Sequence, residues 1–528
     1  MLGHLDFNAL RHRPSCVILC AVFGFMVGMY TGYGHGLAKF YLEICLGVAL
    51  LSAVIRRAAP YICSFAFLYL AGVAYVNSHE LENCPDLNRR KSMLLTIRPD
   101  SVDGKASENV AYGYGRVLEA PERYEKIVGH RMYFILKYDE IFPARGQKLQ
   151  ISTQVEYIGR RKTKPFLRFL RKNHVFLYGS NGKIEKYLSE KSWFDCICER
   201  YRGKFFHALR CGLGNRGNIG VMTGMLTGSK YMLSREQKDD FCSTGTAHIF
   251  AISGFHIGVI ALFFDWFLRL FKLSRRLRAL PVIAILFAYL SIIGPTSSSM
   301  RAYVTVVFYY SAALFSRRSN VFSSFTNSAA VNICLAPESI FSVSFLLSYG
   351  IVFGIICIGA NLSKLLNGLR WRERWLRRRT LIEKLKGNFC SGIIDNFCVA
   401  FAASISSIPL SVEFFGNFSY LTILLNLILV PLASVVIFLG VLSLLLGSCN
   451  VFALCALVNK LAAIPISLIN FTLDCSRRFG HGLVHVPYPL EGIWIPSLVL
   501  VAIIGWHLAR IVEGMKSGDE SPAMRRNL

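Results

Sequence analysis

Long apolar runs give most of this chain the character of membrane helices, and one extended polar segment interrupts them. A helix that crosses a bilayer needs roughly 20 mostly apolar residues, so the pattern predicts a polytopic α-helical membrane protein. Pro409 and Pro431 are expected to break or kink two of the runs, which leaves the number of spans open. The runs lie near residues 15–33, 37–54, 61–76, 244–271, 280–293, 303–315, 321–335, 341–360, 397–410, 421–446, 452–473 and 493–509.

Between residues 105 and 190, apolar and polar positions alternate instead. This period of two is typical of half-buried strands, and three are predicted, at residues 110–118, 131–137 and 148–155. Basic grooves with stacking rings bind single-stranded nucleic acid, so a small β-barrel with a DNA-binding face is predicted. Tyrosines packed into a barrel core would give the same pattern. The residues that share the predicted binding face are Tyr112, Tyr114, Arg116, Arg131, Tyr133 and Lys137.

The barrel is predicted to be an insertion between groups of membrane helices. Residues 191–213 mix aromatic and basic side chains, a pattern typical of an amphipathic helix that lies on a membrane surface. The predicted order is N-terminal transmembrane helices (1–79), the OB-like barrel (80–190), the interfacial helix (191–213), a transmembrane channel domain (214–512) and a cytoplasmic tail (513–528).

Composition and charge limit the class of protein and predict the orientation of the chain in the membrane. A hydrophobic content of 53% excludes an ordinary soluble enzyme, and the net charge of +27 suggests an anionic partner. Positive loops stay in the cytoplasm, so Arg56, Arg57 and the basic run 370–379 are expected on that side of the cytoplasmic (inner) membrane. The barrel would then lie outside, and the C-terminus would be cytoplasmic.

Polar groups gather at the start of one apolar run, in residues 244–259. Polar side chains at membrane depth are costly and usually mark a pathway or a site. Gly254 and Gly258 are four residues apart, a spacing that lets a second helix backbone approach closely. This stretch is therefore predicted to be a packed helix that carries functional polar groups.

Residues 228–258 and several later fragments resemble the ComEC-type competence proteins, which are inner-membrane channels for incoming single-stranded DNA. The resemblance spans about residues 105–435. Its later fragments are residues 294–302 and 345–349, Pro409 with Phe415, and Asn426 with Pro431. The signature itself is carried by Gly228, Gly245, His248, Ala251, Ser253, Gly254 and His256, with Phe255 where a leucine is expected.

The resemblance implies an OB-like fold for the barrel and a channel that takes up single-stranded DNA during natural transformation. Expected partners are single-stranded DNA, membrane lipids, an external DNA receptor, and a cytoplasmic ATPase motor or single-strand-binding protein; a homo-oligomer is also open. The predicted translocation path contains His248, Ser253, Gly254, His256, Arg301, Ser348 and Asn426. Helix packing is assigned to Gly245, Gly258, Pro409 and Pro431.

The sequence predicts no catalytic residue, metal site or cofactor. Many proteins of the resembled family carry a metallo-β-lactamase-like domain, but the chain contains no His-x-His-x-Asp-His cluster. Degradation of the other DNA strand is therefore expected from a separate nuclease. There is no Walker A motif either, so the driving force is expected from another protein.

Other interpretations stay open. His248 and His256 would equally serve as packing residues that join helices by hydrogen bonds, and Arg301 as a residue that snorkels at a helix end. An intramembrane serine hydrolase would use Ser253 with a nearby histidine, although the Gly-x-Ser-x-Gly context is missing. A secondary transporter of an anionic small solute would contain similar broken helices, but the basic barrel argues against it.

Overall fold

The computed structural model gives the architecture of most of the chain after residue 90. The three N-terminal apolar runs, the pair Arg56 and Arg57, and residues 373–379 of the basic run lie outside the described residues. The described residues are 91–105, 110–138, 143, 146–158, 166–167, 170, 175–189, 193–229, 232–317, 319–335, 342–372, 381–478, 482–486 and 494–519.

Five strands form a closed barrel, with the order β1-β2-β3-β5-β4 around the wall. All neighbours are antiparallel except β3 and β5, which run parallel. A closed five-stranded barrel is the architecture of the OB-fold, so the predicted OB-like domain is confirmed. The strands are β1 (Lys91–Lys105), β2 (Val110–Glu119), β3 (Arg131–Lys137), β4 (Leu149–Tyr157) and β5 (Leu177–Tyr187), and a short 3-10 helix, η2 (Glu122–Ile127), joins β2 to β3.

Alternation along the strands fills the barrel. In β3, Met132, Phe134 and Leu136 are fully buried, while the residues between them point outward. Two glycines of β5 let strands approach closely: a Cβ at Gly182 would lie 2.3 Å from a methyl group of Leu136. The three predicted strands are confirmed as β2, β3 and β4, because alternating burial is a local property of the sequence.

The rest of the described chain is helical except for a two-stranded sheet. By length and composition, five of its helices or helix pairs are able to cross a membrane, which confirms a helical membrane protein with a small barrel; the predicted helices before the barrel lie outside the described residues. The helices are α6 (Trp193–Arg210), α7 (Arg216–Thr227), α8 (Arg235–Ser243), η3 (Ala247–Phe250), α9 (Gly254–Leu270), α10 (Arg275–Ile293), α11 (Ser297–Leu314), α12 (Val321–Leu335), α13 (Val343–Gly354), η5 (Ile355–Gly359), α14 (Ala360–Arg372), α15 (Leu381–Phe415), α16 (Thr422–Ser448), α17 (Phe452–Arg478) and α18 (Trp494–Asp519).

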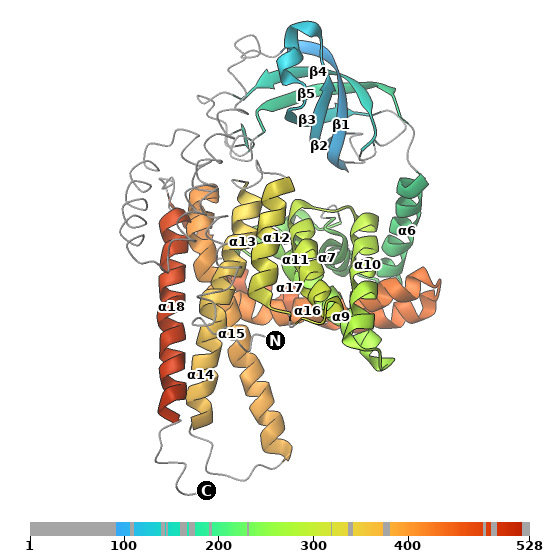
Figure 1. Cartoon of the computed structure of the whole chain (residues 1–528). Helices are drawn as coiled ribbons and strands as arrows, with labels where there is room; N and C mark the ends of the chain where they lie inside the picture. Colours follow the sequence, from blue (N-terminus) through green and yellow to red (C-terminus); the bar gives the residue numbers. More distant parts are fainter. Residues whose placement is uncertain are drawn as a thin grey trace, which may run out of the picture.

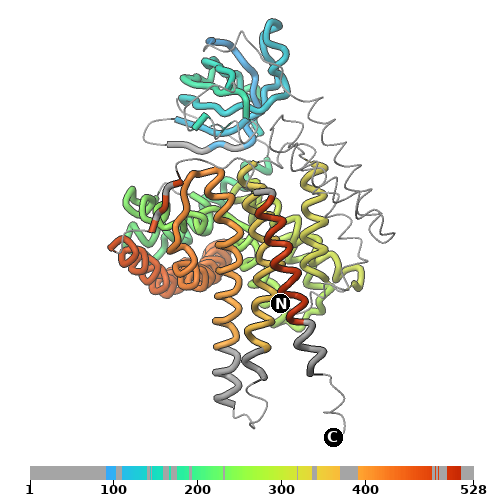
Figure 2. The backbone as a smooth tube through the Cα atoms, turned by 90° about the vertical axis from the view of Figure 1, so that its left-hand side faces the viewer, coloured from blue at the N-terminus to red at the C-terminus, as the bar shows by residue number. Residues whose placement is uncertain are grey.

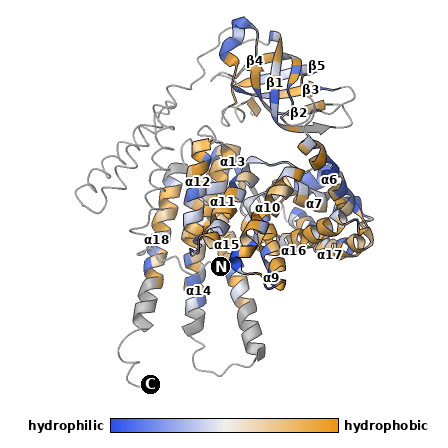
Figure 3. Cartoon of the chain, turned by 45° about the vertical axis from the view of Figure 1, so that its right-hand side comes forward, coloured by the Kyte–Doolittle hydropathy of each residue, from blue (hydrophilic) through white to orange (hydrophobic). Residues whose placement is uncertain are grey.

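The barrel and the helical part occupy opposite ends of the molecule. Figure 1 shows the barrel at the top, with the turn between α9 and α10 on the side of the helical part that faces away from it. In Figures 1 and 2, α14, α15 and α18 lie side by side and reach farthest from the barrel. Figure 3 shows hydrophobic residues along the helices and a mixture of both kinds on the barrel, as expected for a membrane part and a solvated domain.

Pro409 and Pro431 were predicted to break or kink two helices, and the predicted breaks are wrong. Pro409 lies inside α15 and Pro431 inside α16, and both helices continue past them. Neighbouring helices and local adjustments satisfy the backbone groups that a proline frees in a membrane part. The chain turns instead at residues 416–421, where β6 (Asn417–Ser419) pairs with β7 (Leu483–His485).

The predicted amphipathic helix is present as α6. Trp193, Phe194 and Ile197 are exposed near its start, whereas its end packs on the helical part. There the carbonyl of Ala208 accepts a hydrogen bond of 2.7 Å from Nδ2 of Asn459 in α17. The start of α6 is thus the part available to a membrane surface, which stays a prediction.

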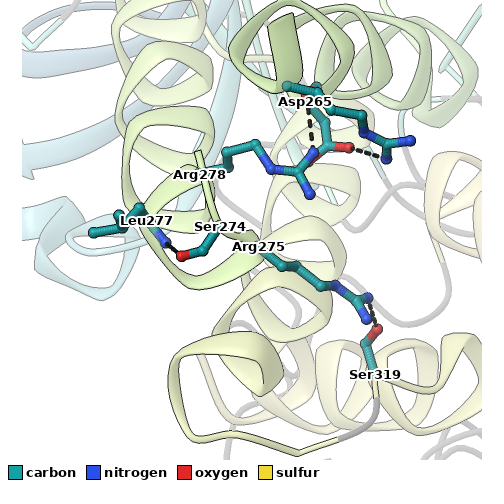
Figure 4. Close-up of polar contacts among 7 residues, drawn as sticks. Asp265, Ser274, Arg275, Leu277, Arg278 and Ser319 are labelled. Carbon is teal, nitrogen blue, oxygen red and sulfur yellow. Dashed lines mark hydrogen bonds and ion pairs between the residues drawn. The ribbon is translucent and has the colours of Figure 1, made fainter. Parts of the chain in front are cut away.

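An ion pair fixes α9 to α10 at the end away from the barrel. Nη1 of Arg278 lies 2.8 Å from Oδ1 of Asp265, and Nη2 of Arg269 lies 3.2 Å from Oδ2 (Figure 4). Asp265 and Arg278 are both buried, so each supplies the charge that the other needs. Arg275 also donates to the Ser319 hydroxyl and ties α10 to the start of α12.

The turn before α9 rests on the start of α16. Oγ1 of Thr422 donates a hydrogen bond of 3.0 Å to the carbonyl of Thr244. Gly245 follows with φ of +72°, and a Cβ there would lie 2.6 Å from Oγ1 of Thr422. Only glycine meets both requirements, which gives Gly245 its predicted role in packing a physical basis.

Gly245→Ala is expected to destabilise the protein, because alanine would be held in the left-handed region against Thr422. We expect a loss of about 1–3 kcal/mol, measured by thermal unfolding in detergent. Gly258→Ala is the matched control, since no described atom lies within 4 Å of its Cβ position in α9. A helical alanine there should be neutral or stabilise by about 0.5–1 kcal/mol. Equal stability of the two variants would contradict this role of the turn.

Candidate functional site

A serine and a histidine of the signature build the first turn of α9. Ser253 is the N-cap residue; Nδ1 of His256 lies 3.0 Å from its Oγ and accepts its backbone N–H at 3.3 Å. This reciprocal cap satisfies two groups that a helix start leaves open. His256 is buried, and its Nε2 lies beside the Ile249 carbonyl without a hydrogen bond of good geometry.

The other signature residues lie around this cap. His248 is exposed on η3, with Nδ1 3.1 Å from the Gly245 carbonyl. A Cβ at Gly254 would lie 3.6 Å from the Cβ of Ala302 in α11, an ordinary contact. Among the described residues, neither Gly254 nor Gly258 thus lies at an approach so close that only glycine fits, which contradicts the close helix approach expected from the pair.

Arg301 is buried between α11 and α13. Its Nη2 donates to the carbonyl and hydroxyl of Ser344 at 2.6 and 2.8 Å, and its Nη1 donates to the Ser297 hydroxyl at 2.7 Å. The side chain is 3% exposed, and Nε has no hydrogen-bond partner in the described part of the chain. The ion pairs of the described residues include none to Arg301. The guanidinium here meets neutral oxygens and the ring of Phe345, whose centroid lies 5.8 Å from Cζ, but no anion among the described residues.

Three helix starts meet beside this arginine. Ser297 is the first residue of α11, and Ser344 is the second of α13. The start of α11 also touches the signature, because Oγ1 of Thr296 lies 3.5 Å from the carbonyl of Ile252, two residues before α9. A helix start carries a partial positive charge and open N–H groups, which favour anions. We name this arrangement of Arg301 and the starts of α9, α11 and α13 the polar mouth.

A hydrogen-bonded network continues from Arg301 into the helices. The Ser328 hydroxyl in α12 lies 3.2 Å from the Arg301 carbonyl and 3.0 Å from the Tyr349 hydroxyl in α13. Nδ2 of Asn332 donates to the Tyr349 hydroxyl at 3.0 Å. The predicted path residue Ser348 precedes Tyr349 and is half-buried. These groups extend the polar surroundings of the arginine from α11 to α12 and α13.

The last predicted path residue, Asn426, lies on α16. It is buried, and its Oδ1 has no partner among the described residues. It lies one helical turn after Thr422, which holds the turn before α9. The predicted path residues therefore lie in several places: at the polar mouth (Ser253, Gly254, His256 and Arg301), one turn after Ser344 in α13 (Ser348), on η3 (His248) and on α16 (Asn426).

The contact between Ser253 and His256 has the geometry of a helix cap. A serine hydrolase needs a base whose second nitrogen is oriented by another group. His256 is not hydrogen-bonded to an acidic side chain among the described residues. In addition, groups of three or more His, Cys, Asp or Glu that could hold a metal ion are absent from the described residues.

The barrel face predicted to bind DNA contains a row of three arginines. Strand register places Arg98 of β1 opposite Arg116 of β2, and Arg116 opposite Arg131 of β3. All three are exposed. Arg131 also lies 3.5 Å from Asp100. Like charges directly opposite each other destabilise a sheet, so a bound anion would relieve this arrangement, which we name the arginine row.

A second pair of like charges lies along the same strand. Lys137 of β3 is in register with Lys183 of β5, and both are exposed. Arg98 and Lys183 were missed in the sequence, because neither β1 nor β5 was predicted. Their basic character was visible, but only the strand pairing places them beside the predicted residues. The β1–β2–β3 side of the barrel is therefore more basic than the predicted set alone.

The tyrosines of this face are partly covered. Tyr133 lies between Tyr114 and Tyr178, with ring centroids 5.3 and 6.2 Å away. Phe166 approaches Tyr133 at 5.2 Å, and Leu170 is fully buried in the same cluster. Burial raises the pKa of Tyr114, and nearby Arg131 partly offsets that shift. Tyr112 is half-buried and lies two residues before Tyr114 in β2. The tyrosines therefore pack under the β4–β5 connection, while the basic residues stay open.

Comparisons with known proteins agree with these features. The family model described as "Competence protein" matches residues 225–511, more than half of the chain. ComE operon protein 3 of Bacillus subtilis (strain 168) is 20% identical over 214 residues, which are 40% of this chain and 24% of that protein. No solved structure matches the chain. The family match contains the whole polar mouth, and this chain, a multi-pass helical membrane protein, belongs to the competence protein family.

Proposed function

We propose that this protein is a channel of the cytoplasmic membrane that takes up single-stranded DNA during natural transformation. The observation that carries the proposal is Arg301, a buried cation whose described partners are all neutral. The backbone phosphates of DNA carry the negative charge that would balance Arg301. The starts of three helices add N–H groups and partial positive charge beside it, as in other sites that bind phosphate.

The geometry also suits passage rather than tight capture. Arg301 is the one ionised side chain of the polar mouth, and the serine, threonine and tyrosine hydroxyls around it are neutral. Contacts of this kind are exchanged easily from one phosphate to the next. A hydroxyl network along α12 and α13 would offer further neutral partners to a strand that advances past the arginine.

The barrel supplies a first contact for the strand. The arginine row offers electrostatic binding that does not depend on base sequence. The barrel lies at the end of the helical part opposite the basic turn between α9 and α10 (Figure 1). The positive-inside rule places that turn in the cytoplasm and the barrel outside. An external receptor would deliver DNA to the barrel, and a cytoplasmic motor or strand-binding protein would provide the driving force.

Arg301→Gln tests the proposal most directly. Glutamine keeps hydrogen-bonding capacity but removes the charge, so entry of fluorescent DNA should fall about tenfold or more, as expected for a lost charge-assisted contact. Arg235→Gln changes an exposed arginine of α8 and should have no effect. Membrane abundance and surface binding of DNA should be normal in both. Unchanged uptake by Arg301→Gln at normal abundance would reject the role of the polar mouth.

The arginine row makes a separate prediction about salt. In the full-length protein in detergent, Arg98→Gln combined with Arg116→Gln should weaken oligonucleotide binding and lower the slope of log K against log salt by about 2. Fluorescence anisotropy at several salt concentrations measures both. Lys186→Gln, on β5, serves as the control outside the row. A slope that the double variant leaves unchanged would place the phosphate contacts elsewhere.

The orientation is tested by reporter fusions. Alkaline phosphatase is active only outside the cytoplasm, so a fusion after Lys191 should be active and a fusion to the C-terminus should be inactive. The physical reason is the basic character of the turns that lie away from the barrel. The reverse pattern of activities would invert the proposed topology.

A further inference from the structure

An aspartate in α15 carries a charge that the described protein does not balance. Asp395 lies in the segment Cys390–Phe415, which is long and apolar enough to cross a membrane. A carboxylate at such a place is costly, and it usually faces a partner or a pathway within the helix bundle. The groups around Asp395 therefore decide whether its charge is balanced.

Neutral groups from two helices surround this carboxylate. Oδ1 of Asp395 accepts a hydrogen bond of 2.5 Å from the Ser363 hydroxyl and one of 2.9 Å from Nδ2 of Asn367, both in α14. The Ser391 hydroxyl, one turn earlier in α15, donates to Oδ1 of Asn367 at 3.0 Å. In the described part of the chain, no hydrogen bond reaches Oδ2 of Asp395.

Charged and titratable groups on the neighbouring elements do not compensate Asp395. Lys364 follows Ser363 on α14, Cys398 is buried on α15 one turn after the aspartate, and His507 is exposed on α18, where its ring packs on Trp506. The described ion pairs and hydrogen bonds join none of these groups to Asp395. Among the described residues, the carboxylate thus meets hydrogen-bond donors but no cation.

Asp265 shows the contrast within the same protein. Both of its carboxylate oxygens are held by arginines, at 2.8 Å from Arg278 and 3.2 Å from Arg269. The protein itself neutralises that aspartate. Asp395 is half-buried and has no such partner among the described residues, so a cation from solution would supply the missing charge.

We propose that Asp395, with Ser363, Asn367 and Ser391, forms a binding site for a small monovalent cation, a proton or a sodium ion. A single carboxylate balances a single positive charge. The oxygens of hydroxyl, amide and carboxylate groups are the hard ligands that such cations take. The site is separate from the polar mouth and does not depend on the proposed function.

The test uses dicyclohexylcarbodiimide, an apolar reagent that modifies protonated carboxyl groups, on the full-length protein in membranes. Mass spectrometry of the peptides should find the adduct on Asp395 and not on Asp265, whose oxygens are held by arginines. Asp395→Asn removes the reactive carboxyl and serves as the control for the assignment. If that variant does not accumulate, the comparison of the two aspartates in the wild-type protein still decides.

Two conditions distinguish the cations. If the ion is sodium, added sodium chloride should protect Asp395 several-fold at constant pH, and choline chloride should not. If it is a proton, modification should fall as the pH rises from mildly acidic to mildly alkaline, with or without sodium. Absence of the adduct under every condition, or an adduct that neither pH nor sodium changes, would overturn the proposal and leave Asp395 as a residue that only joins two helices.

Discussion

The cost of placing charge away from water is the constraint on which the helical part of this protein depends. An ion that leaves water needs a partner of opposite charge or a set of well-placed hydrogen bonds. Asp265 has two arginines and is balanced within the chain. Arg301 and Asp395 have only neutral partners among the described residues, so each leaves a net charge. The two charges have opposite sign, and the span Val343–Gly368 contributes residues to the surroundings of both.

Unbalanced positive charge costs less free energy on the barrel than inside the helical part. Arg98, Arg116 and Arg131 repel one another across three strands, but they are exposed, and water and salt screen the repulsion. A polyanion that displaces this screening is held loosely and released easily. Inside the helices, a single arginine has a larger effect because little water surrounds it. The two parts would therefore act on the same strand with different strength, through many weak contacts outside and few stronger ones within.

Local periodicity explains what could be predicted from the sequence. The strands at residues 110–118 and 131–137 and most apolar helices were predicted correctly, because alternation and long apolar runs are properties of neighbouring residues. The prolines misled, since continuity of α15 and α16 depends on the helices packed around them. Arg98 was missed because only pairing of β1 with β2 brings it beside Arg116. The partner of Arg301, Ser344, is 43 positions away, and no local pattern connects the two. The assignment of Arg301 itself came from the family resemblance, and its role in DNA passage stays a proposal.

The short connection after the barrel sets a limit on how the two parts work together. β5 ends at Tyr187 and α6 begins at Trp193, so five residues join the barrel to the helical part on that side. Even fully extended, such a linker reaches only about 20 Å. The end of α6 is in turn anchored on α17 through Ala208. The short linker therefore keeps the barrel close to the helical part. A DNA strand bound to the barrel would remain within a few nucleotides of the helices. A polymer that lets go of one part would be recaptured by the other before it diffuses away.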